Sequence, residues 1–252
     1  MKITRLTTMK FLVLALMSGL ISSAVLSQER IWKSVILAEF FTSQGCNTCP
    51  PADDFLLELD TRKEVLPIAY HVDYWDYLGW KDTFGDKKFS DRQRDYARGI
   101  SSTRYYTPQV IIDGQYHLVG SHRNKVNKIL HNLDHQASSA PEISLGEETL
   151  NISWNSPPAE FDTVFFVLID SRTHNVQINA GENRGKVIPY GNVVTDIIEL
   201  PVRSSNQLGN IQWDGSVIAN LGCPKDHNVA LIFQQKNGKY PVQVTDTFYS
   251  TC

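Results

Sequence analysis

The sequence predicts an α/β domain with a mixed sheet and flanking helices, followed by a β-rich, sandwich-like domain. Two observations carry this prediction. Across residues 34–135, apolar strand-like runs alternate with amphipathic helical patterns. After a small-residue segment at 137–141, short β-rich runs follow one another, separated by Gly, Pro and Asn. We therefore expect one domain at 28–137 and a second at 138–252.

The N-terminus has the parts of a secretory signal peptide. Three basic residues, Lys2, Arg5 and Lys10, precede a largely apolar stretch at 11–26. Residues 25–27 are small enough for cleavage before Gln28. An uncleaved anchor is the alternative, but the stretch falls short of the ~20 residues that a span needs. We expect a signal peptide at 1–27 and a periplasmic or secreted protein. No later segment is apolar enough to cross a bilayer, so no membrane span is expected in the mature chain.

The composition excludes one class of partner without naming another. The chain has 252 residues and a formal net charge of -3, and its basic residues are not clustered. Nucleic acid is therefore not an expected partner. We expect no cofactor and assign no metal site, and the composition gives no indication of the oligomeric state.

The first half begins with a predicted βαβ unit. Residues 34–41 form an apolar strand, residues 51–62 a helix with one apolar face, and residues 65–72 a second strand. A right-handed crossover makes the two strands parallel.

The rest of the first half predicts a helix, a hairpin and a closing helix. Residues 86–100 form a polar, amphipathic helix, whose arginines are expected to face solvent. Strands at 109–112 and 116–119 flank a tight Asp-Gly turn, and residues 121–135 form the last helix. The predicted order is β-α-β-α-β-β-α.

The second half predicts an antiparallel sandwich of short strands. A Gly-Glu-Asn-Arg-Gly segment at 181–185 predicts a plain turn, with a loop packed against the first domain or a ligand as the alternative. The expected strands are residues 142–153, 164–170, 176–179, 193–200, 216–219, 229–234 and 242–249.

Cys46 and Cys49 form a Cys-x-x-Cys pair where the first strand meets the first helix. Cysteines at this spacing close a small disulfide ring and reopen it when a partner thiolate attacks. A helix N-terminus stabilises the thiolate that such chemistry requires. The pair therefore predicts redox activity, with a static structural disulfide as the alternative. Cys223 and Cys252 are a candidate for a second, structural bridge.

The element order resembles the thioredoxin fold, with the cysteines after the first strand and Thr107-Pro108 before the third. In that family a cis-proline at this place faces the cysteine pair and presents its backbone to a substrate peptide. The resemblance therefore implies a catalytic role for Pro108 and a substrate-binding role for Thr107. Four segments also resemble a bacterial family of secreted thioredoxin-like proteins catalogued as domain of unknown function 1223. They are residues 40–53, 71–80, 106–109 and 181–183.

Polar and aromatic residues follow the second predicted strand. His71 and Asp73 lie at its carboxyl end, where ligands gather in open α/β sheets, and are candidate acid/base groups. Trp75, Tyr77 and Trp80 belong to a loop that a compact thioredoxin fold does not need. We expect this loop to form an apolar groove for a peptide or small ligand, with a small covering core as the alternative.

These features predict an exported thiol-disulfide oxidoreductase. Cys46 attacks and forms a mixed disulfide, Cys49 resolves it, and Pro108 aligns the substrate. The expected partners are protein or small-molecule thiols and disulfides. Two alternatives remain open: a non-catalytic envelope binding module with a locked disulfide, and a copper- or zinc-binding protein that uses the two thiols and His71.

Overall fold

The computed structural model of the chain describes eight stretches of residues. They are 33–100, 104–133, 142–145, 149–153, 161–201, 210–214, 226–237 and 240–251. The expected signal peptide, the strand expected at 216–219, and both Cys223 and Cys252 lie outside the described residues.

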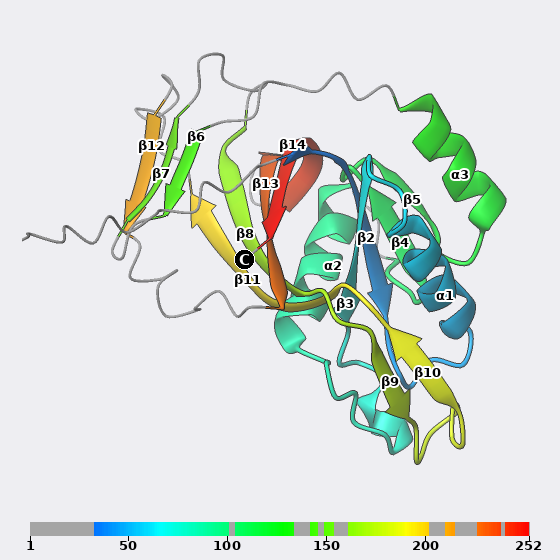
Figure 1. Cartoon of the computed structure of the whole chain (residues 1–252). Coiled ribbons are helices and arrows are strands. Elements are labelled where there is room, and N and C mark those ends of the chain that lie inside the picture. The colour runs from blue at the N-terminus through cyan, green and yellow to red at the C-terminus, as the bar shows by residue number, and fades with distance from the viewer. Residues whose placement is uncertain are drawn as a thin grey trace, which may run out of the picture.

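One large mixed sheet dominates the described part of the molecule (Figure 1). Its strand order is β1-β14-β13-β8-β11-β3-β2-β4-β5. The strands are β1 (Lys33–Ser34), β2 (Ile36–Thr42), β3 (Val65–His71), β4 (Gln109–Ile112), β5 (Tyr116–Val119), β8 (Thr163–Asp170), β11 (Val193–Pro201), β13 (His227–Asn237) and β14 (Tyr240–Thr251). Two smaller sheets consist of β9 (His174–Gln177) with β10 (Val187–Tyr190), and of β6 (Glu142–Leu145), β7 (Thr149–Ser153) and β12 (Asn210–Asp214).

The first half follows the predicted order of elements. Strand β2 runs parallel to β3 and antiparallel to β4, and β4 and β5 have the predicted bounds. Residues 113–115 connect the two strands, and the Gln115 N–H donates to the Ile112 carbonyl at 2.9 Å across the turn. Asp113 and Gly114 inside this turn have positive φ angles, 46° and 69°, a conformation that Asp and Gly tolerate. The helices are α1 (Pro50–Leu59), α2 (Lys87–Gly99), α3 (Arg123–Asn132) and the short 3₁₀ helix η1 (Asp76–Leu78).

The alternation of side chains along β2 divides the core between the two faces of the sheet. Ala38 and Phe40 pack on the face covered by α1 and α3, together with Phe55 of α1. Leu37 and Phe41 point to the opposite face, which α2 covers. Because a strand alternates its side chains with period two, a continuous apolar run such as β2 can fill both layers.

Four strands of the second half, β8, β11, β13 and β14, extend the large sheet of the first half. Strand β11 pairs with β3 in parallel at Val193 and Ala69, and the Ala69 amide donates to the Asn192 carbonyl at 2.9 Å. Strands β8, β13 and β14 continue from β11 in antiparallel pairs. Hydrogen bonds of this one sheet therefore join strands from both sides of residue 137. The expected sandwich is not confirmed, and the expected domain boundary at residue 137 stays a prediction.

The expectation that the arginines of α2 face solvent is wrong for Arg92. Its side chain is buried, and Nε donates to Glu39 Oε1 at 2.6 Å. The guanidinium also lies 4.4 Å from the centre of the Phe165 ring of β8. A buried cation needs a partner anion and a polarisable surface, and β2 and β8 supply them.

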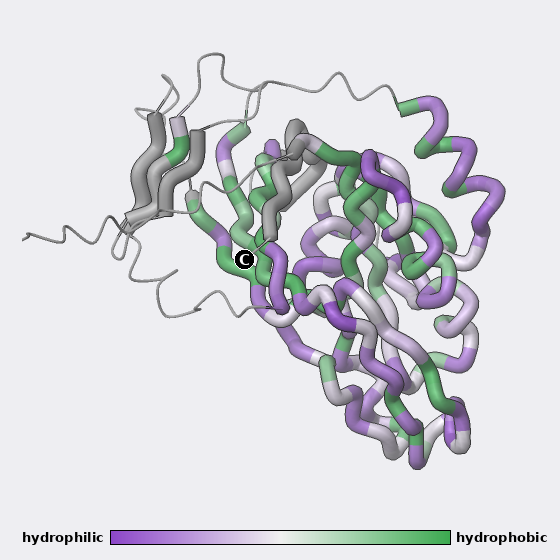
Figure 2. The backbone as a smooth tube through the Cα atoms, in the orientation of Figure 1, coloured by the Kyte–Doolittle hydropathy of each residue, from purple (hydrophilic) through white to green (hydrophobic). Residues whose placement is uncertain are grey.

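Hydropathy along the chain agrees with this layering (Figure 2). The central strands of the large sheet are mainly hydrophobic, whereas α3 is mainly hydrophilic, with buried Val126 and Leu130 one turn apart. Among the helices in the described stretches, none has the length and apolar character needed to cross a membrane.

Candidate redox site

Cys46 and Cys49 form a disulfide between the end of β2 and the start of α1. Their Cα atoms are 5.4 Å apart, and neither cysteine is exposed to solvent. Pro50 and Pro51 occupy the first turn of α1, where a missing backbone N–H costs nothing because that group has no partner within the helix. Strand β2 and helix α1 thus fix both ends of the disulfide ring.

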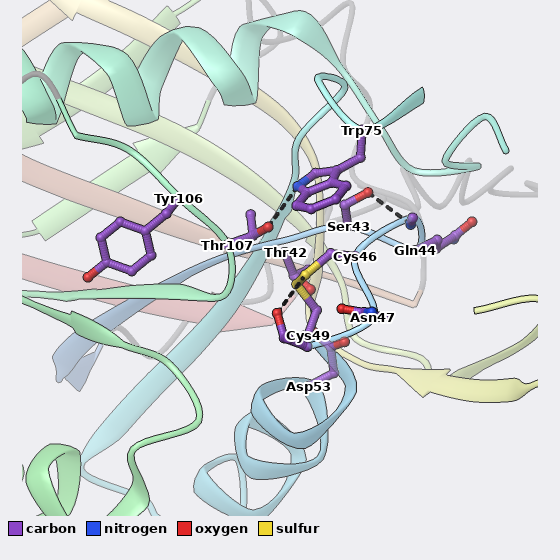
Figure 3. Close-up of a disulfide and its surroundings, with 12 residues drawn as sticks. Thr42, Ser43, Gln44, Cys46, Asn47, Cys49, Asp53, Trp75, Tyr106 and Thr107 are labelled. Carbon is purple, nitrogen blue, oxygen red and sulfur yellow. Dashed lines mark hydrogen bonds between the residues drawn. A yellow bond between two sulfur atoms is a disulfide. The ribbon is translucent and has the colours of Figure 1, made fainter. Parts of the chain in front are cut away.

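The Thr107-Pro108 peptide bond is cis. Thr107 Oγ1 accepts a 2.7 Å hydrogen bond from Trp75 Nε1, and Figure 3 shows the Trp75 indole beside both Thr107 and the disulfide. The segment that precedes β4 and the aromatic loop after β3 therefore meet at the cysteines, although they lie 32 positions apart in the sequence.

The three aromatic residues singled out in that loop have different surroundings. Trp75 lies beside the disulfide, whereas Tyr77 is 80% exposed on η1. Trp80 packs against a small core that includes Ile178 and Tyr190 of the second half. The covering core expected as the alternative is thus present at Trp80, and Figure 3 shows Trp75 close to Cys46.

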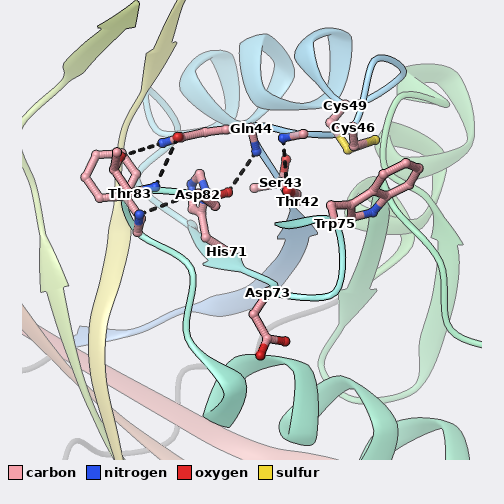
Figure 4. Close-up of polar contacts among 12 residues, drawn as sticks. Thr42, Ser43, Gln44, Cys46, Cys49, His71, Asp73, Trp75, Asp82 and Thr83 are labelled. Carbon is pink, nitrogen blue, oxygen red and sulfur yellow. Dashed lines mark hydrogen bonds and ion pairs between the residues drawn. A yellow bond between two sulfur atoms is a disulfide. The ribbon is translucent and has the colours of Figure 1, made fainter. Parts of the chain in front are cut away.

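Gln44, a residue that sequence reasoning missed, ties the cysteine loop to the aromatic loop. Its backbone N–H donates to Asp82 Oδ2 at 2.8 Å, and its amide Nε2 donates to Thr83 Oγ1 at 2.8 Å. Trp80 Nε1 and the Thr83 amide both donate to its Oε1. Figure 4 shows the contacts of Gln44 with Asp82 and Thr83, near the cysteines. No periodic pattern in the sequence indicates such a set, because each contact joins two loops.

His71 is fully buried and binds Asp82. The two atoms that meet, Nδ1 and Oδ2, are 2.9 Å apart. Burial opposes ionisation of Asp82, but His71 and the backbone amides of Gln44 and Phe84 hold its pKa below the ordinary value. His71 Nε2 has no hydrogen-bond partner among the described residues. The ring also packs edge-on against Phe84 and Tyr190, so His71 belongs to the site's wall and does not face solvent.

Asp53 is the buried carboxyl group nearest in sequence to the disulfide. It follows Cys49 by one helical turn, and its backbone N–H donates to the Cys49 carbonyl at 3.1 Å. Thr42 donates to Oδ1 at 2.6 Å, while Oδ2 has no partner among the described residues. Burial raises the pKa of Asp53 to about 7, even though Thr42 and His71 act to lower it. The four-residue spacing from Cys49 was the sequence signal that could have identified this group.

The structure does not bring Asp73 to the cysteines. Its carboxylate accepts a hydrogen bond from Ser90 of α2, and Figure 4 shows it directed away from the disulfide. Within the described residues, no group of three or more His, Cys, Asp and Glu side chains is arranged to hold a metal ion.

These features define an α/β protein with a buried Cys-x-x-Cys disulfide beside a cis-proline loop. The chain belongs to the family described as "Protein of unknown function (DUF1223)", whose model matches residues 37–233. This confirms the family indicated by the sequence segments.

Two solved structures are similar to the chain. One is a protein of Agrobacterium tumefaciens determined as a structural genomics target, with 26% identity and a TM-score of 0.67. The similarity covers 86% of this chain and 93% of that chain. The other is HBP35 of Porphyromonas gingivalis, with 14% identity, a TM-score of 0.52, and coverage of 87% and 76% respectively, a likeness that shows the fold alone. None of the curated proteins matches the chain.

Proposed function

We propose that this chain is an exported thiol-disulfide oxidoreductase on a thioredoxin-like scaffold. The observation that carries the proposal is the disulfide Cys46–Cys49 at the N-terminal end of α1, beside the cis Thr107-Pro108 peptide. The basic and apolar N-terminal sequence supports export, and export supplies the oxidising compartment in which such a pair works.

The proposed thiol–disulfide exchange has two steps. A thiolate of the partner attacks Cys46 Sγ, the bond to Cys49 breaks, and Cys49 leaves with the electron pair as a thiolate. The second thiol of the partner, after losing its proton, then attacks the mixed disulfide and releases Cys46. The partner loses two electrons and two protons as its own disulfide forms, and the cysteine pair gains them. The steps run in reverse when the reduced pair meets a partner disulfide.

Asp53 is placed to handle the proton of Cys49. Its pKa of about 7 keeps the carboxyl group partly protonated near neutral pH, and it lies one turn after Cys49 on α1. A group with a pKa close to the working pH both donates and accepts a proton readily. We assign Asp53 the transfer of a proton to the Cys49 thiolate during reduction, and its removal during oxidation.

Access to Cys46 requires Trp75 to move. Both cysteines have no solvent-exposed surface, and the Trp75 indole beside them is held by Thr107. We expect a partner that approaches the cis-proline loop to break this hydrogen bond as its thiolate reaches Sγ.

The burial of the cysteines favours a second candidate function, a non-catalytic binding module with a structural disulfide. In that case Trp75 is a permanent cover and the cysteine pair does not exchange. The two functions differ in how readily the disulfide is reduced under native conditions.

Redox titration of the mature protein, starting at Gln28, separates them. The wild type is equilibrated with a series of dithiothreitol or glutathione buffers, and free thiols are counted after acid quenching and alkylation, with Cys46→Ser as the matched control. The oxidoreductase predicts a reversible transition near periplasmic potentials that disappears in the variant. A pair that stays oxidised until the fold is lost refutes it and establishes the structural disulfide.

A further inference from the structure

The loop that joins β9 to β10 comes from the second half of the chain and lies against the cysteine turn. It is held by its own hydrogen bonds, since the Gly185 amide donates to the Ile178 carbonyl at 2.8 Å and the Ile178 amide to the Lys186 carbonyl at 2.9 Å. Its chain direction reverses through Gly181 and Gly185, whose φ angles of 72° and 85° favour glycine. These hydrogen bonds and turns define the backbone conformation of the loop.

Asn183, in the middle of this loop, is completely buried. Its Nδ2 donates to two backbone carbonyls, that of Gln44 at 2.9 Å and that of Cys46 at 2.8 Å. Its Oδ1 accepts from Lys186 Nζ at 2.8 Å, so the orientation of the amide is defined by its partners at both ends. The two carbonyls bracket Gly45 and Cys46, and holding both fixes the backbone that carries the Cys46 sulfur.

Glu182 places a negative charge against the same turn. Its Oε2 lies 3.4 Å from the backbone nitrogen of Asn47, the residue that follows Cys46. A carboxylate beside this peptide opposes the formation of a second negative charge on the neighbouring thiol. The effect is modest because the contact is exposed to solvent.

We infer that residues 181–186 form a clamp that sets the reactivity of Cys46, with Asn183 as a positioning residue and Glu182 as an electrostatic brake on thiolate formation. The inference rests on the proposed exchange reaction. We further infer that the two bonds of Asn183, which are made in the disulfide form, weaken when the cysteine turn relaxes on reduction, so that the clamp favours the oxidised state. A loop from the β-rich half thereby tunes a pair carried by the α/β half.

The first test measures the equilibrium between the cysteine pair and dithiothreitol. Asn183→Ala removes both donors, and Asn183→Leu removes them while keeping the side chain close to its original size and uncharged. We expect both variants to be reduced more easily than the wild type, by about threefold or more in the equilibrium constant. Asn175→Ala, an exposed site on β9, is the control and should match the wild type. Equality of both Asn183 variants with this control overturns the positioning role.

The second test measures the rate of iodoacetamide alkylation of the reduced protein between pH 6 and 9. Glu182→Gln preserves shape and removes the charge, and we expect its rate at pH 7 to rise by about two- to fivefold, with a profile displaced to lower pH. A profile superimposable on that of Asn175→Ala overturns the electrostatic role. Failure of the proposed function looks different, because then the wild type itself is not reduced under native conditions.

Discussion

At the scale of single residues, Asp53 links the stability of the protein to pH. Its pKa is about 7 in the folded protein, against 3.8 for an unperturbed aspartate. Below both values the carboxyl is neutral in the folded and the unfolded chain, and burial is not penalised. Between them the unfolded chain ionises first and binds fewer protons, so stability falls as pH rises. Above pH 7 the loss is complete and levels off.

Asp53→Asn is expected to remove this pH dependence. The amide still accepts from Thr42 and remains neutral at every pH. Relative to the wild type, the variant should gain about 2–3 kcal/mol in the free energy of unfolding between pH 5 and pH 8. Urea unfolding at the two pH values measures this difference. Asp54→Asn, at the exposed neighbouring position, is the control, and identical gains in both variants would contradict the assignment.

The residues of the candidate site differ in how well they could be predicted from the sequence. The cysteine pair follows from a local motif, and the place of Thr107-Pro108 from resemblance to a known fold. Asn183 lies 137 positions after Cys46, and no local pattern indicates that its amide returns to that carbonyl. Asp82 was missed for a similar reason, because its partners Gln44 and His71 reach it only when two loops meet.

At the scale of helices and strands, the sequence predicted the hairpin of β4 and β5 correctly, because its two strands are adjacent in the chain. The hairpin of β4 and β5 has its predicted bounds because its turn and its alternating strands are contiguous in sequence. Strand β10 was missed although it pairs with the preceding strand β9, because Pro189 interrupts its short apolar run. The pairing of β11 with β3 had no signal, since the two strands are distant in sequence. The burial of Arg92 depends likewise on Glu39 and Phe165, which other elements contribute.

Helix α2 is anchored to the sheet by the buried ion pair of Arg92 and Glu39. Arg92→Ala leaves the Glu39 carboxylate buried without its cation, and we expect a loss of about 3–5 kcal/mol in the free energy of unfolding. Arg94→Ala, on the same helix but paired with partly exposed Asp91, should cost about 0–1 kcal/mol. Chemical denaturation measures both.

The double variant Glu39→Gln/Arg92→Ala separates charge from packing. Neutralising Glu39 relieves the unpaired anion, so the double variant should lose less than the sum of the two single variants. Additive losses would mean that Arg92 stabilises the helix only through its contacts with the aromatic rings around it.

At the scale of the whole molecule, one hydrophobic core spans both halves of the chain. Leu37, Phe41 and Tyr70 of the first half belong to the same buried cluster as Val167 and Ile232 of the second. The hydrogen bonds of the large sheet also continue from β3 to β11 and β8. Removing the second half therefore exposes the apolar face of the first and frees the edge of β3.

We accordingly predict that the mature chain unfolds in a single cooperative transition and that the fragment 28–137 does not fold alone. Coincident urea transitions by far-ultraviolet circular dichroism and tryptophan fluorescence test the first statement. Loss of near-ultraviolet dichroism and of a cooperative transition in the fragment tests the second.

The matched control is a full-length chain cut at a protease site inserted within 134–141. The cut chain keeps both halves and should remain folded, because only their covalent link is lost. A fragment that unfolds cooperatively, at a urea midpoint equal to that of the mature chain, would instead establish two independent domains and show that the shared core contributes little to stability.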